Sequence, residues 1–253
     1  MNWIRQRVLE RKLLAGTFLG LGSSLTAEIA AGSGFDWILV DLEHGAGDRP
    51  QLVGQLQAIS GSPAAPVVRI HWNDQPTFKR ILDLGASGIM VPFVSTPAEA
   101  EEAAASIQYP PEGERGVAIL TRASGFGVHF DEYFEEANRN LLLVGQIESV
   151  EGVKNAEAIA AVDRVDVLFV GPMDLSVSLG IPRQFDHPDF RAALAEVVEA
   201  CKKHGKAAGI LAGAPAQLER FVEDGFTFIA CGSDAGLVAA GMRNIVSSFD
   251  SLR

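Results

Sequence analysis

Eight short apolar runs, separated by stretches with helical character, constrain the fold of this chain more than any other feature. Each run is bounded by glycine, proline or polar residues, as expected for strands that are buried on both faces of a parallel sheet. Strands that alternate with helices favour right-handed βα units. Eight such units predict a closed (β/α)8 TIM barrel, although a doubly wound open sheet has a similar pattern. The predicted strands are Leu14–Leu19, Trp37–Asp41, Pro66–Ile70, Gly88–Val91, Leu142–Ile147, Asp166–Val170, Ala207–Leu211 and Phe226–Ala230.

Helical patterns fill the intervals, and several of them end in a glycine suited to a helix C-cap, such as Gly34, Gly85 and Gly225. No linker or change of composition divides the chain, so we expect one domain over residues 1–253. The predicted helices are Ser24–Gly32, Arg49–Ile59, Gln75–Leu84, Pro97–Ser106, Asp131–Asn138, Val150–Ala161, Pro188–His204 and Ala214–Asp224.

The composition argues against two kinds of binding partner. A formal net charge of −11 argues against a nucleic-acid or anionic-membrane surface, so neither partner is expected. Cys201 and Cys231 are too few for a disulfide framework or a zinc cluster, and we expect both to be buried thiols. The N-terminal residues lack a long apolar region before a cleavage site, and no apolar run reaches membrane-spanning length. The expected location is therefore the cytoplasm.

Two carboxylates follow apolar runs where strands should give way to loops. Glu148 ends Val144–Glu148, and Asp174 follows Val165–Met173. In a parallel barrel, both acids would emerge on the C-terminal rim, where barrel enzymes place their active sites. Hard oxygen ligands that leave room for water and a chelating substrate suit Mg²⁺ or Mn²⁺ better than zinc. The sequence therefore predicts a metal-dependent enzyme.

Further polar residues stand at the ends of other predicted strands. Asp41 and His44 share one loop, where a carboxylate beside an imidazole would suit a proton relay. Arg69 lies among apolar neighbours and needs an anionic partner, which a developing oxyanion would provide. Gln146 lies in the predicted strand that ends just before Glu148.

Each of these positions also has a purely structural interpretation. Asp174 could cap a helix, Glu148 could pair with a core arginine, and Arg69 could belong to a structural ion pair. His44 could be an ordinary loop histidine, and Asp41 could be a capping acid. Their common place at the ends of successive strands favours the functional interpretation.

Nearly the whole chain resembles the HpcH/HpaI class II aldolases, which cleave 4-hydroxy-2-oxo acids to a 2-oxo acid and an aldehyde. Each motif alone is weak, and together they are a strong signal. The motifs that carry the resemblance are Gly34–His44, Val67–Arg69 with Trp72–Asp74, Tyr109–Gly116, Gln146–Glu148 and Phe169–Ser176.

The resemblance implies a role for each candidate residue. Glu148 and Asp174 match the ligands of a divalent metal, which would be Mg²⁺, Mn²⁺ or Co²⁺. Arg69 matches the arginine that stabilises the pyruvate enolate, and Asp41 with His44 matches the proton-transfer pair. The positions implied to contact substrate are Gln146, Met173, Asp174, Arg122 and Leu211.

The implied reaction is reversible cleavage of a 4-hydroxy-2-oxo acid to pyruvate, or hydroxypyruvate, and an aldehyde through an enolate. The aldehyde specificity is open, because Phe18, Leu120–Arg122 and Leu211–Gly213 depart from or vary among relatives. A decarboxylase acting on oxaloacetate would use the same enolate, and a non-catalytic metabolite-binding barrel is a third interpretation. No lysine stands where a Schiff base would form, which weakens the class I alternative.

Two segments bear on assembly. Within the long interval Gly116–Asn140, Thr121–Gly127 is a candidate lid or part of a subunit contact; a plain surface excursion is the alternative. In an oligomer, Arg122 would meet an anionic acceptor tail at a neighbour's active site. Near the C-terminus, Leu237, Met242, Ile245 and Phe249 fall close to one helical stripe. That helix could pack on its own barrel. The resemblance implies instead that it is exchanged between subunits of a homotrimer or homohexamer.

Overall fold

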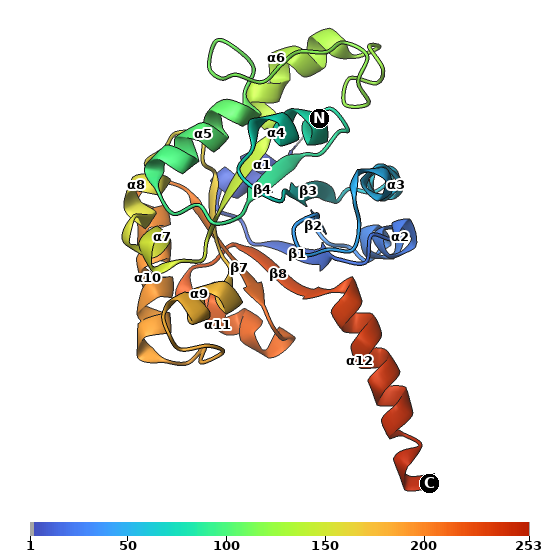
Figure 1. The fold of residues 1–253 in the computed structure, drawn as a ribbon, viewed down its shortest axis with the longest axis vertical. Helices are drawn as coiled ribbons and strands as arrows, with labels where there is room; N and C mark the ends of the chain where they lie inside the picture. Colours follow the sequence, from blue (N-terminus) through green and yellow to red (C-terminus); the bar gives the residue numbers. More distant parts are fainter. Residues whose placement is uncertain (1–2, 253) are drawn as a thin grey trace.

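The computed structural model describes residues 3–252, in which eight parallel strands follow one another in chain order around a closed barrel (Figure 1). Pairing of β1 with both β2 and β8 closes the sheet. The predicted (β/α)8 barrel is confirmed, and the open-sheet alternative is wrong. The predicted domain also includes residues 1, 2 and 253, which lie outside the described residues. The strands are β1 Leu14–Leu19, β2 Trp37–Asp41, β3 Ala65–Arg69, β4 Gly88–Val91, β5 Leu142–Ile147, β6 Val167–Val170, β7 Ala207–Ala212 and β8 Phe228–Ser233.

Helices cover the outside of the barrel and agree closely with the predicted ranges. The predicted helix Val150–Ala161 is divided in two at Asn155, whose side-chain amide donates to the carbonyl oxygen of Ser95 at 2.8 Å. Helix α1 was not expected, and α9 was considered only as a helix that Asp174 could cap. The helices are α1 Ile4–Leu9, α2 Ser24–Gly32, α3 Arg49–Ile59, α4 Gln75–Leu82, α5 Pro97–Ile107, α6 Phe130–Asn140, α7 Val150–Lys154, α8 Ala156–Ala160, α9 Pro172–Ser178, α10 Pro188–Lys203, η1 Pro215–Gln217, α11 Leu218–Asp224, α12 Asp234–Ser247 and η2 Asp250–Leu252.

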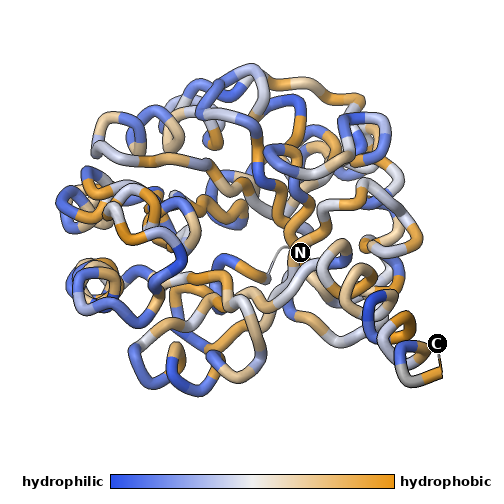
Figure 2. Tube along the Cα trace, turned by 60° about the horizontal axis from the view of Figure 1, so that its bottom comes forward, coloured by the Kyte–Doolittle hydropathy of each residue, from blue (hydrophilic) through white to orange (hydrophobic). Residues whose placement is uncertain are grey.

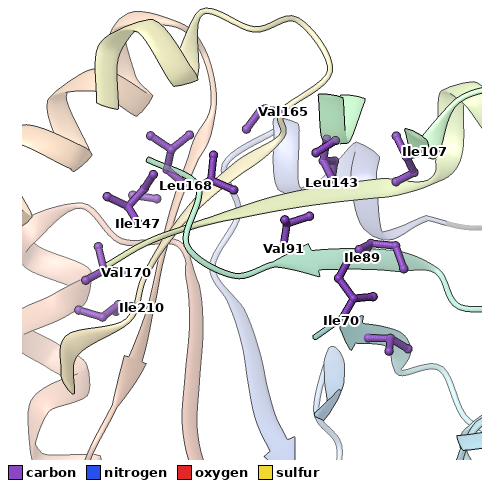
Figure 3. Packing of buried hydrophobic residues seen from close by; sticks show 14 of the residues in the cluster. Ile70, Ile89, Val91, Ile107, Leu143, Ile147, Val165, Leu168, Val170 and Ile210 are labelled. Carbon is purple, nitrogen blue, oxygen red and sulfur yellow. The ribbon is translucent and has the colours of Figure 1, made fainter. Parts of the chain in front are cut away.

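The alternation of side chains along each strand produces two apolar layers. Trp37 and Leu39 point into the barrel, whereas Ile38 and Val40 pack outward against the helices. Inside, the ring of Trp37 stacks on Phe228, with centroids 3.9 Å apart and planes inclined by 12°. The outer layer joins neighbouring strands to the surrounding helices, and Figure 3 shows part of it, from Ile70 to Ile210.

Gly16 is required by the inner layer. A Cβ atom at this position would lie 2.1 Å from Cε2 of Trp37, so any other residue would displace the largest buried ring of the barrel. The packed interior means that the barrel is a core and not a pore. Access to substrate is therefore confined to the ends of the strands.

A buried ion network lies at the N-terminal ends of β5, β6 and β7. Asp166 is fully buried and accepts hydrogen bonds from Arg5 Nε at 2.9 Å and from Arg164 Nη1 at 2.8 Å. The backbone N–H of Leu143 donates to the same carboxylate at 3.0 Å. Burial without such partners would be prohibitive for a carboxylate. The network ties α1 to the start of the sheet.

The long segment before β5 lies at this same N-terminal end. Helices of the barrel run antiparallel to the strands, so α5 ends and β5 begins there, and Figure 1 shows α6 beside α1, away from α9. Arg122 donates from Nη1 to the carbonyl oxygen of Leu84 at 2.7 Å and from Nη2 to that of Leu56 at 3.4 Å. The interpretation of this segment as a lid over its own active site is wrong. Arg122 therefore lies away from the rim of its own chain, and its contact with an acceptor at a neighbour's active site stays a prediction.

Arg115 fixes the beginning of this segment. The residue is 1% exposed. Its Nη2 donates to Asp83 Oδ1 at 2.9 Å and to the Tyr133 hydroxyl at 3.1 Å. The guanidinium also lies over the ring of Tyr109, 4.3 Å from its centroid. The three partners come from α4, from α6 and from the loop that follows α5. Arg115 therefore joins the excursion to the body of the barrel.

The C-terminal helix α12 extends away from the barrel (Figure 1). Its first residue, Asp234, is held by hydrogen bonds from the backbone N–H of Gly20 at 2.8 Å and from Thr26 Oγ1 at 2.7 Å. Beyond this anchor the apolar stripe is exposed, and hydrophobic residues recur along the projecting segment in Figure 2. Packing of the stripe on its own barrel is therefore wrong. Its exchange with a neighbouring subunit stays a prediction.

No helix within residues 3–252 is long and apolar enough to cross a membrane. The two cysteines are free thiols: Cys201 is buried as expected, whereas Cys231 is only partly buried. Burial raises the pKa of the Cys201 thiol to about 12. Cys201 therefore behaves as a small packed side chain.

We expect Arg115→Ala to lower the free energy of unfolding by about 3 kcal/mol, because it removes one partner of a buried ion pair and leaves the segment before α6 without its anchor. Arg139→Ala is the matched control, since Arg139 pairs with Glu136 on the exposed face of α6 and should contribute about 0.5 kcal/mol. Urea denaturation of both variants measures the difference. Equal, small losses would show that Arg115 does not stabilise this part of the fold.

Candidate active site

The C-terminal ends of β2, β3 and β5 bring the predicted polar residues together. Asp41 and Arg69 are directly opposed in the register of β2 and β3, and Gln146 and Glu148 follow from β5. All four are buried, with between 2% and 7% of each residue exposed. Because the strands are parallel, their ends converge on one rim of the barrel. The structure therefore brings these four residues together on one rim, as the sequence pattern predicts.

Arg69 and Asp41 form a bidentate ion pair. Arg69 donates from Nε to Asp41 Oδ1 at 2.9 Å and from Nη2 to Asp41 Oδ2 at 2.7 Å. Burial by itself would raise the pKa of Asp41, but the hydrogen bonds and charge of Arg69, together with the backbone N–H groups of Glu43 and His44, hold it below its usual value. The guanidinium lies 5.5 Å from the ring centroid of Phe18. Its plane and position are therefore fixed.

The expected pairing of Asp41 with the imidazole of His44 is wrong. Asp41 accepts a hydrogen bond from the backbone N–H of His44 at 3.3 Å, while its side chain faces Arg69 inside the rim. The His44 side chain is 67% exposed, and its Nε2 lies 3.8 Å from Glu43 Oε1. The physical reason is that the Asp41 side chain is directed inward to the buried guanidinium of Arg69, whereas the His44 side chain is directed out of the rim. The capping interpretation of Asp41 is partly right, because the carboxylate does hold this loop.

Glu43 was not singled out from the sequence, although it stands between Asp41 and His44. One of its carboxylate oxygens, Oε2, lies 3.0 Å from Arg69 Nη1, and the other lies toward His44. Burial raises the pKa of Glu43, and the charges of Asp41 and Asp174 act in the same direction against those of Arg69 and His44. The two acids that alternate before His44, Asp41 and Glu43, were the signal that could have identified Glu43.

Gln146 connects the arginine to the first predicted metal ligand. Its amide oxygen accepts from Arg69 Nη1 at 3.5 Å, and its amide nitrogen donates to Glu148 Oε2 at 2.6 Å. The other oxygen of Glu148 accepts from the backbone N–H of Phe93 at 2.9 Å. Among the described residues Glu148 makes no ion pair with an arginine, so the core-pair interpretation is wrong. A continuous polar path runs from Asp41 through Arg69 and Gln146 to Glu148.

The pKa of the Glu148 carboxyl is strongly raised. Burial raises its pKa to about 7, and the charges of Asp174 and Glu43 add to this against the Phe93 N–H and Arg69. A buried carboxylate with two like charges nearby is destabilised in its ionised form unless a cation joins it. The side chains therefore fit a cation that would be held by Glu148 and Asp174.

Asp174 lies within the first turn of α9, which begins at Pro172 with Gly171 as its N-cap residue. The interpretation of Asp174 as the N-cap is therefore wrong. Its side chain is half-buried and accepts no hydrogen bond within residues 3–252. Those same residues contain no group of three or more His, Cys, Asp or Glu side chains arranged to hold an ion. Two carboxylates alone suit a hard cation that completes its coordination with water and substrate oxygens.

Met173 and Leu211, two predicted substrate contacts, line one cavity next to this site. Met173 directly precedes Asp174, and Leu211 belongs to β7. The structure thus brings seven of the nine predicted site residues to the C-terminal rim and the adjoining cavity. His44 lies at its exposed edge, and Arg122 lies at the opposite end of the barrel.

Comparisons with known proteins agree with this arrangement. The family model of the HpcH/HpaI aldolase/citrate lyase family matches residues 14–240. The chain is 41% identical to a 5-keto-4-deoxy-D-glucarate aldolase of Salmonella arizonae over 248 residues, which cover 98% of this chain and 96% of that protein.

Solved structures of the same family superpose on the whole barrel. A family member from Burkholderia cenocepacia J2315 has a TM-score of 0.94 at 38% identity, with 98% of this chain and 99% of that chain covered. An HpcH/HpaI aldolase from Desulfitobacterium hafniense DCB-2 has a TM-score of 0.93 at 29% identity, with 100% and 98% covered. Class II aldolases of this family depend in general on a divalent metal. The chain belongs to the HpcH/HpaI aldolase/citrate lyase family and is an aldolase, a carbon–carbon lyase whose rim fits cleavage of a 4-hydroxy-2-oxo acid to pyruvate and an aldehyde.

Proposed function

We propose that Glu148 and Asp174 hold Mg²⁺, Mn²⁺ or Co²⁺, and that Arg69 stabilises the enolate of pyruvate or hydroxypyruvate during cleavage. The single observation that carries the proposal is the polar path from Asp41 to Glu148, which places a fixed guanidinium one side chain away from a carboxylate in need of a cation. When bound, the divalent ion would act as a Lewis acid toward the 2-oxo acid.

Arg69 would act through its fixed position. The two hydrogen bonds to Asp41 orient the guanidinium before substrate arrives, so no reorganisation is needed when negative charge develops on the enolate oxygen. Gln146 accepts a hydrogen bond from Nη1, the guanidinium nitrogen that does not donate to Asp41. Gln146 would also orient the carboxylate or keto group of the 2-oxo acid. Asp41 is thus proposed to position Arg69 and not to relay a proton.

His44 would handle the proton of the C4 hydroxyl. Its ring lies at the open edge of the rim, where an aldehyde would leave or enter, with Nε2 3.8 Å from Glu43 Oε1. This division separates two halves of the site. The enolate half consists of Arg69, Glu148 and Asp174, and the aldehyde half includes His44.

Decarboxylation of oxaloacetate is the second candidate, because the enolate half is complete without His44. That reaction generates the same enolate and needs no base at a C4 hydroxyl. The two reactions would therefore share Arg69 but differ in their need for His44.

The exposed stripe of α12 supports a proposal on assembly. Leu237, Met242 and Ile245 are each about two-thirds exposed, which is unusual for large apolar side chains that share one helical face. We propose that α12 packs on a neighbouring subunit of a homotrimer or homohexamer. The partners of the site itself would be small molecules, namely a 2-oxo acid and an aldehyde.

We expect Glu148→Gln to weaken Mn²⁺ binding by at least a hundredfold, because a neutral amide replaces one of only two anionic ligands. Isothermal titration calorimetry of the chelator-treated protein measures the dissociation constant. Glu151→Gln, an exposed acid on α7, is the matched control and should bind Mn²⁺ as the parent does. Chelation should abolish cleavage, and Mg²⁺, Mn²⁺ or Co²⁺ should restore it. Full activity in excess chelator would rule the proposed site out.

We expect Arg69→Ala to lower kcat about a hundredfold or more in three reactions: aldol cleavage, oxaloacetate decarboxylation and exchange of the pyruvate methyl protons. Lysine should rescue poorly, since an ammonium lacks the fork that pairs with Asp41. His44→Ala should lower cleavage far more than decarboxylation. Arg80→Ala, on the exposed face of α4, controls for loss of charge. Equal losses of both reactions in His44→Ala would contradict the separate aldehyde half.

We expect deletion of residues from Gly236 onward to dissociate or aggregate the protein, because the stripe would lose its place on a neighbour. Light scattering of the parent should give the mass of three or six chains. Glu132→Gln, an exposed position on α6, is a surface control that should leave the mass unchanged. An active monomer that tolerates the deletion would overturn the proposed exchange.

A further inference from the structure

The first residue of α12 is bonded to a loop near the other end of the chain. Asp234 is buried, and its carboxylate accepts hydrogen bonds from the backbone N–H groups of Gly20 at 2.8 Å and Leu21 at 3.3 Å. The Thr26 hydroxyl donates to the same carboxylate at 2.7 Å. Gly20 and Leu21 lie between β1 and α2, and Thr26 lies in the first turn of α2. Asp234 therefore fixes both the start of α2 and the loop before it.

Capping of α12 does not account for this arrangement. The N-cap residue is Ser233, whose Oγ accepts from the backbone N–H of Gly236 at 3.1 Å. Asp234 also accepts from the backbone N–H of Ala235 at 2.8 Å. Its three other donors come from residues 208 to 214 positions earlier in the chain. A buried carboxylate that collects donors from another element ties the two elements together.

The loop between β1 and α2 touches the loop between β2 and α3, which carries His44. The carbonyl oxygen of Gly20 accepts from the backbone N–H of Ala46 at 2.7 Å. Glycines allow the two backbones to meet: a Cβ atom at Gly22, where φ is +64°, would lie 2.7 Å from the Cα atom of Gly47. The position of one loop therefore sets the position of the other.

His44 is thus held from both sides. On one side, its backbone N–H donates to Asp41 Oδ1 at 3.3 Å. On the other side, Ala46 is bonded to Gly20, which is bonded to Asp234. The imidazole itself is largely exposed, so its position over the rim depends on the backbone that carries it.

We propose that Asp234 is a positioning residue for aldol cleavage, which places His44 through the bonded loops at Gly20 and Ala46. This inference rests on the proposed function, in which His44 handles the proton of the C4 hydroxyl. A displacement of about 1 Å at a catalytic group can lower a rate about a hundredfold. Asp234 thereby joins the root of α12 to the aldehyde half of the site.

The enolate half is held by separate contacts. Arg69 is paired with Asp41, and Glu148 is bonded to Gln146 and to the backbone N–H of Phe93. These residues come from β2, β3 and β5 and from the loops after β4 and β5. Loss of the anchor at the root of α12 should therefore impair cleavage and spare the reactions that need the enolate alone.

The experiment compares three reactions of the Mn²⁺-loaded enzyme: cleavage of 4-hydroxy-2-oxopentanoate, decarboxylation of oxaloacetate and exchange of the pyruvate methyl protons. We expect Asp234→Ala to lower kcat for cleavage at least about tenfold, because two backbone N–H groups lose their acceptor and the loop shifts. The other two reactions should stay within about threefold of the parent. Equal losses in all three reactions, or an unchanged rate of cleavage, would overturn the inference.

Asp74→Ala is the matched control, because Asp74 is also a carboxylate at the start of a helix on this rim. It accepts from the backbone N–H of Thr77 at 3.2 Å and from the Thr77 hydroxyl at 2.7 Å, both within α4. Its loss should lower stability and leave the ratio of cleavage to decarboxylation unchanged. A change of this ratio as large as that in Asp234→Ala would contradict a specific role for Asp234.

Thr26→Val and Thr26→Ser decide the question if Asp234→Ala does not fold. Valine keeps the shape and removes the hydroxyl that donates to Asp234, whereas serine keeps the hydroxyl. We expect Thr26→Val to lower cleavage relative to decarboxylation by about threefold or more, and Thr26→Ser to retain the ratio of the parent. The same ratio in the valine and serine variants would count against the inference.

The double variant of Asp234→Ala with His44→Ala shows whether Asp234 acts through His44. If it does, the double variant should cleave within about twofold of His44→Ala alone, whereas a further tenfold loss would show an independent role and refute the inference. The parent separates the two levels of proposal. If it exchanges no pyruvate methyl protons, the proposed function fails. If exchange occurs but Asp234→Ala has no selective effect on cleavage, the positioning role alone is wrong.

Discussion

The bidentate pair of Arg69 with Asp41 is the interaction on which the whole rim depends. A guanidinium that is 93% buried is tolerated only when carboxylates surround it, and here Asp41 and Glu43 both do so. Burial raises the pKa of Glu148 to about 7, and the charges of Asp174 and Glu43 add to this rise, while Arg69 opposes it. The ion pair thus fixes a guanidinium beside a carboxylate that is costly to ionise, which is the arrangement on which the proposed metal site rests.

The two ends of the barrel have different physical roles. At the N-terminal end, the Asp166 carboxylate accepts hydrogen bonds from Arg5, from Arg164 and from the backbone N–H of Leu143, all within the same chain. At the C-terminal end, the Asp174 carboxylate finds no hydrogen-bond partner within residues 3–252, and His44 extends into solvent. Satisfied networks stabilise and rigidify, whereas unsatisfied groups are available to ligands. The rim can remain open because the opposite end secures the fold.

Apolar surfaces that are exposed on the single chain favour assembly into an oligomer. The stripe on α12 has no apolar partner on its own barrel beyond its anchored start, and the segment before α6 exposes Leu120 and Phe126. In contrast, the cavity lined by Met173, Leu211 and Phe221 lies between α9, β7 and α11 of the same chain. The exposed stripe and the rim thus occupy different parts of the barrel.

The sequence by itself determined the barrel and most of the rim. Apolar runs such as Trp37–Asp41 and Leu142–Ile147 have the same bounds in the structure, because strands buried on both faces leave little freedom in their pattern. Glu148, Arg69 and Gln146 were predictable as neighbours, since parallel strand ends must meet on one rim. Neither the partner of Asp41 nor the role of Glu43 was predictable. Adjacent residues in a loop point in directions that only the folded backbone sets, and it turned Asp41 inward and His44 outward.

Arg122 shows the same limit over a longer distance. Its place in a variable loop suggested a substrate contact, but the return of α5 to the N-terminal end carries the loop away from the rim, and two helix-end carbonyls bind the guanidinium. The cavity beside Met173 likewise depends on Phe221, which belongs to α11 and lies far from Met173 in the chain. Local pattern determined the type of each element and the end at which each strand residue lies. Tertiary packing decided which side chains meet, because contacts between elements depend on distances that no local pattern encodes.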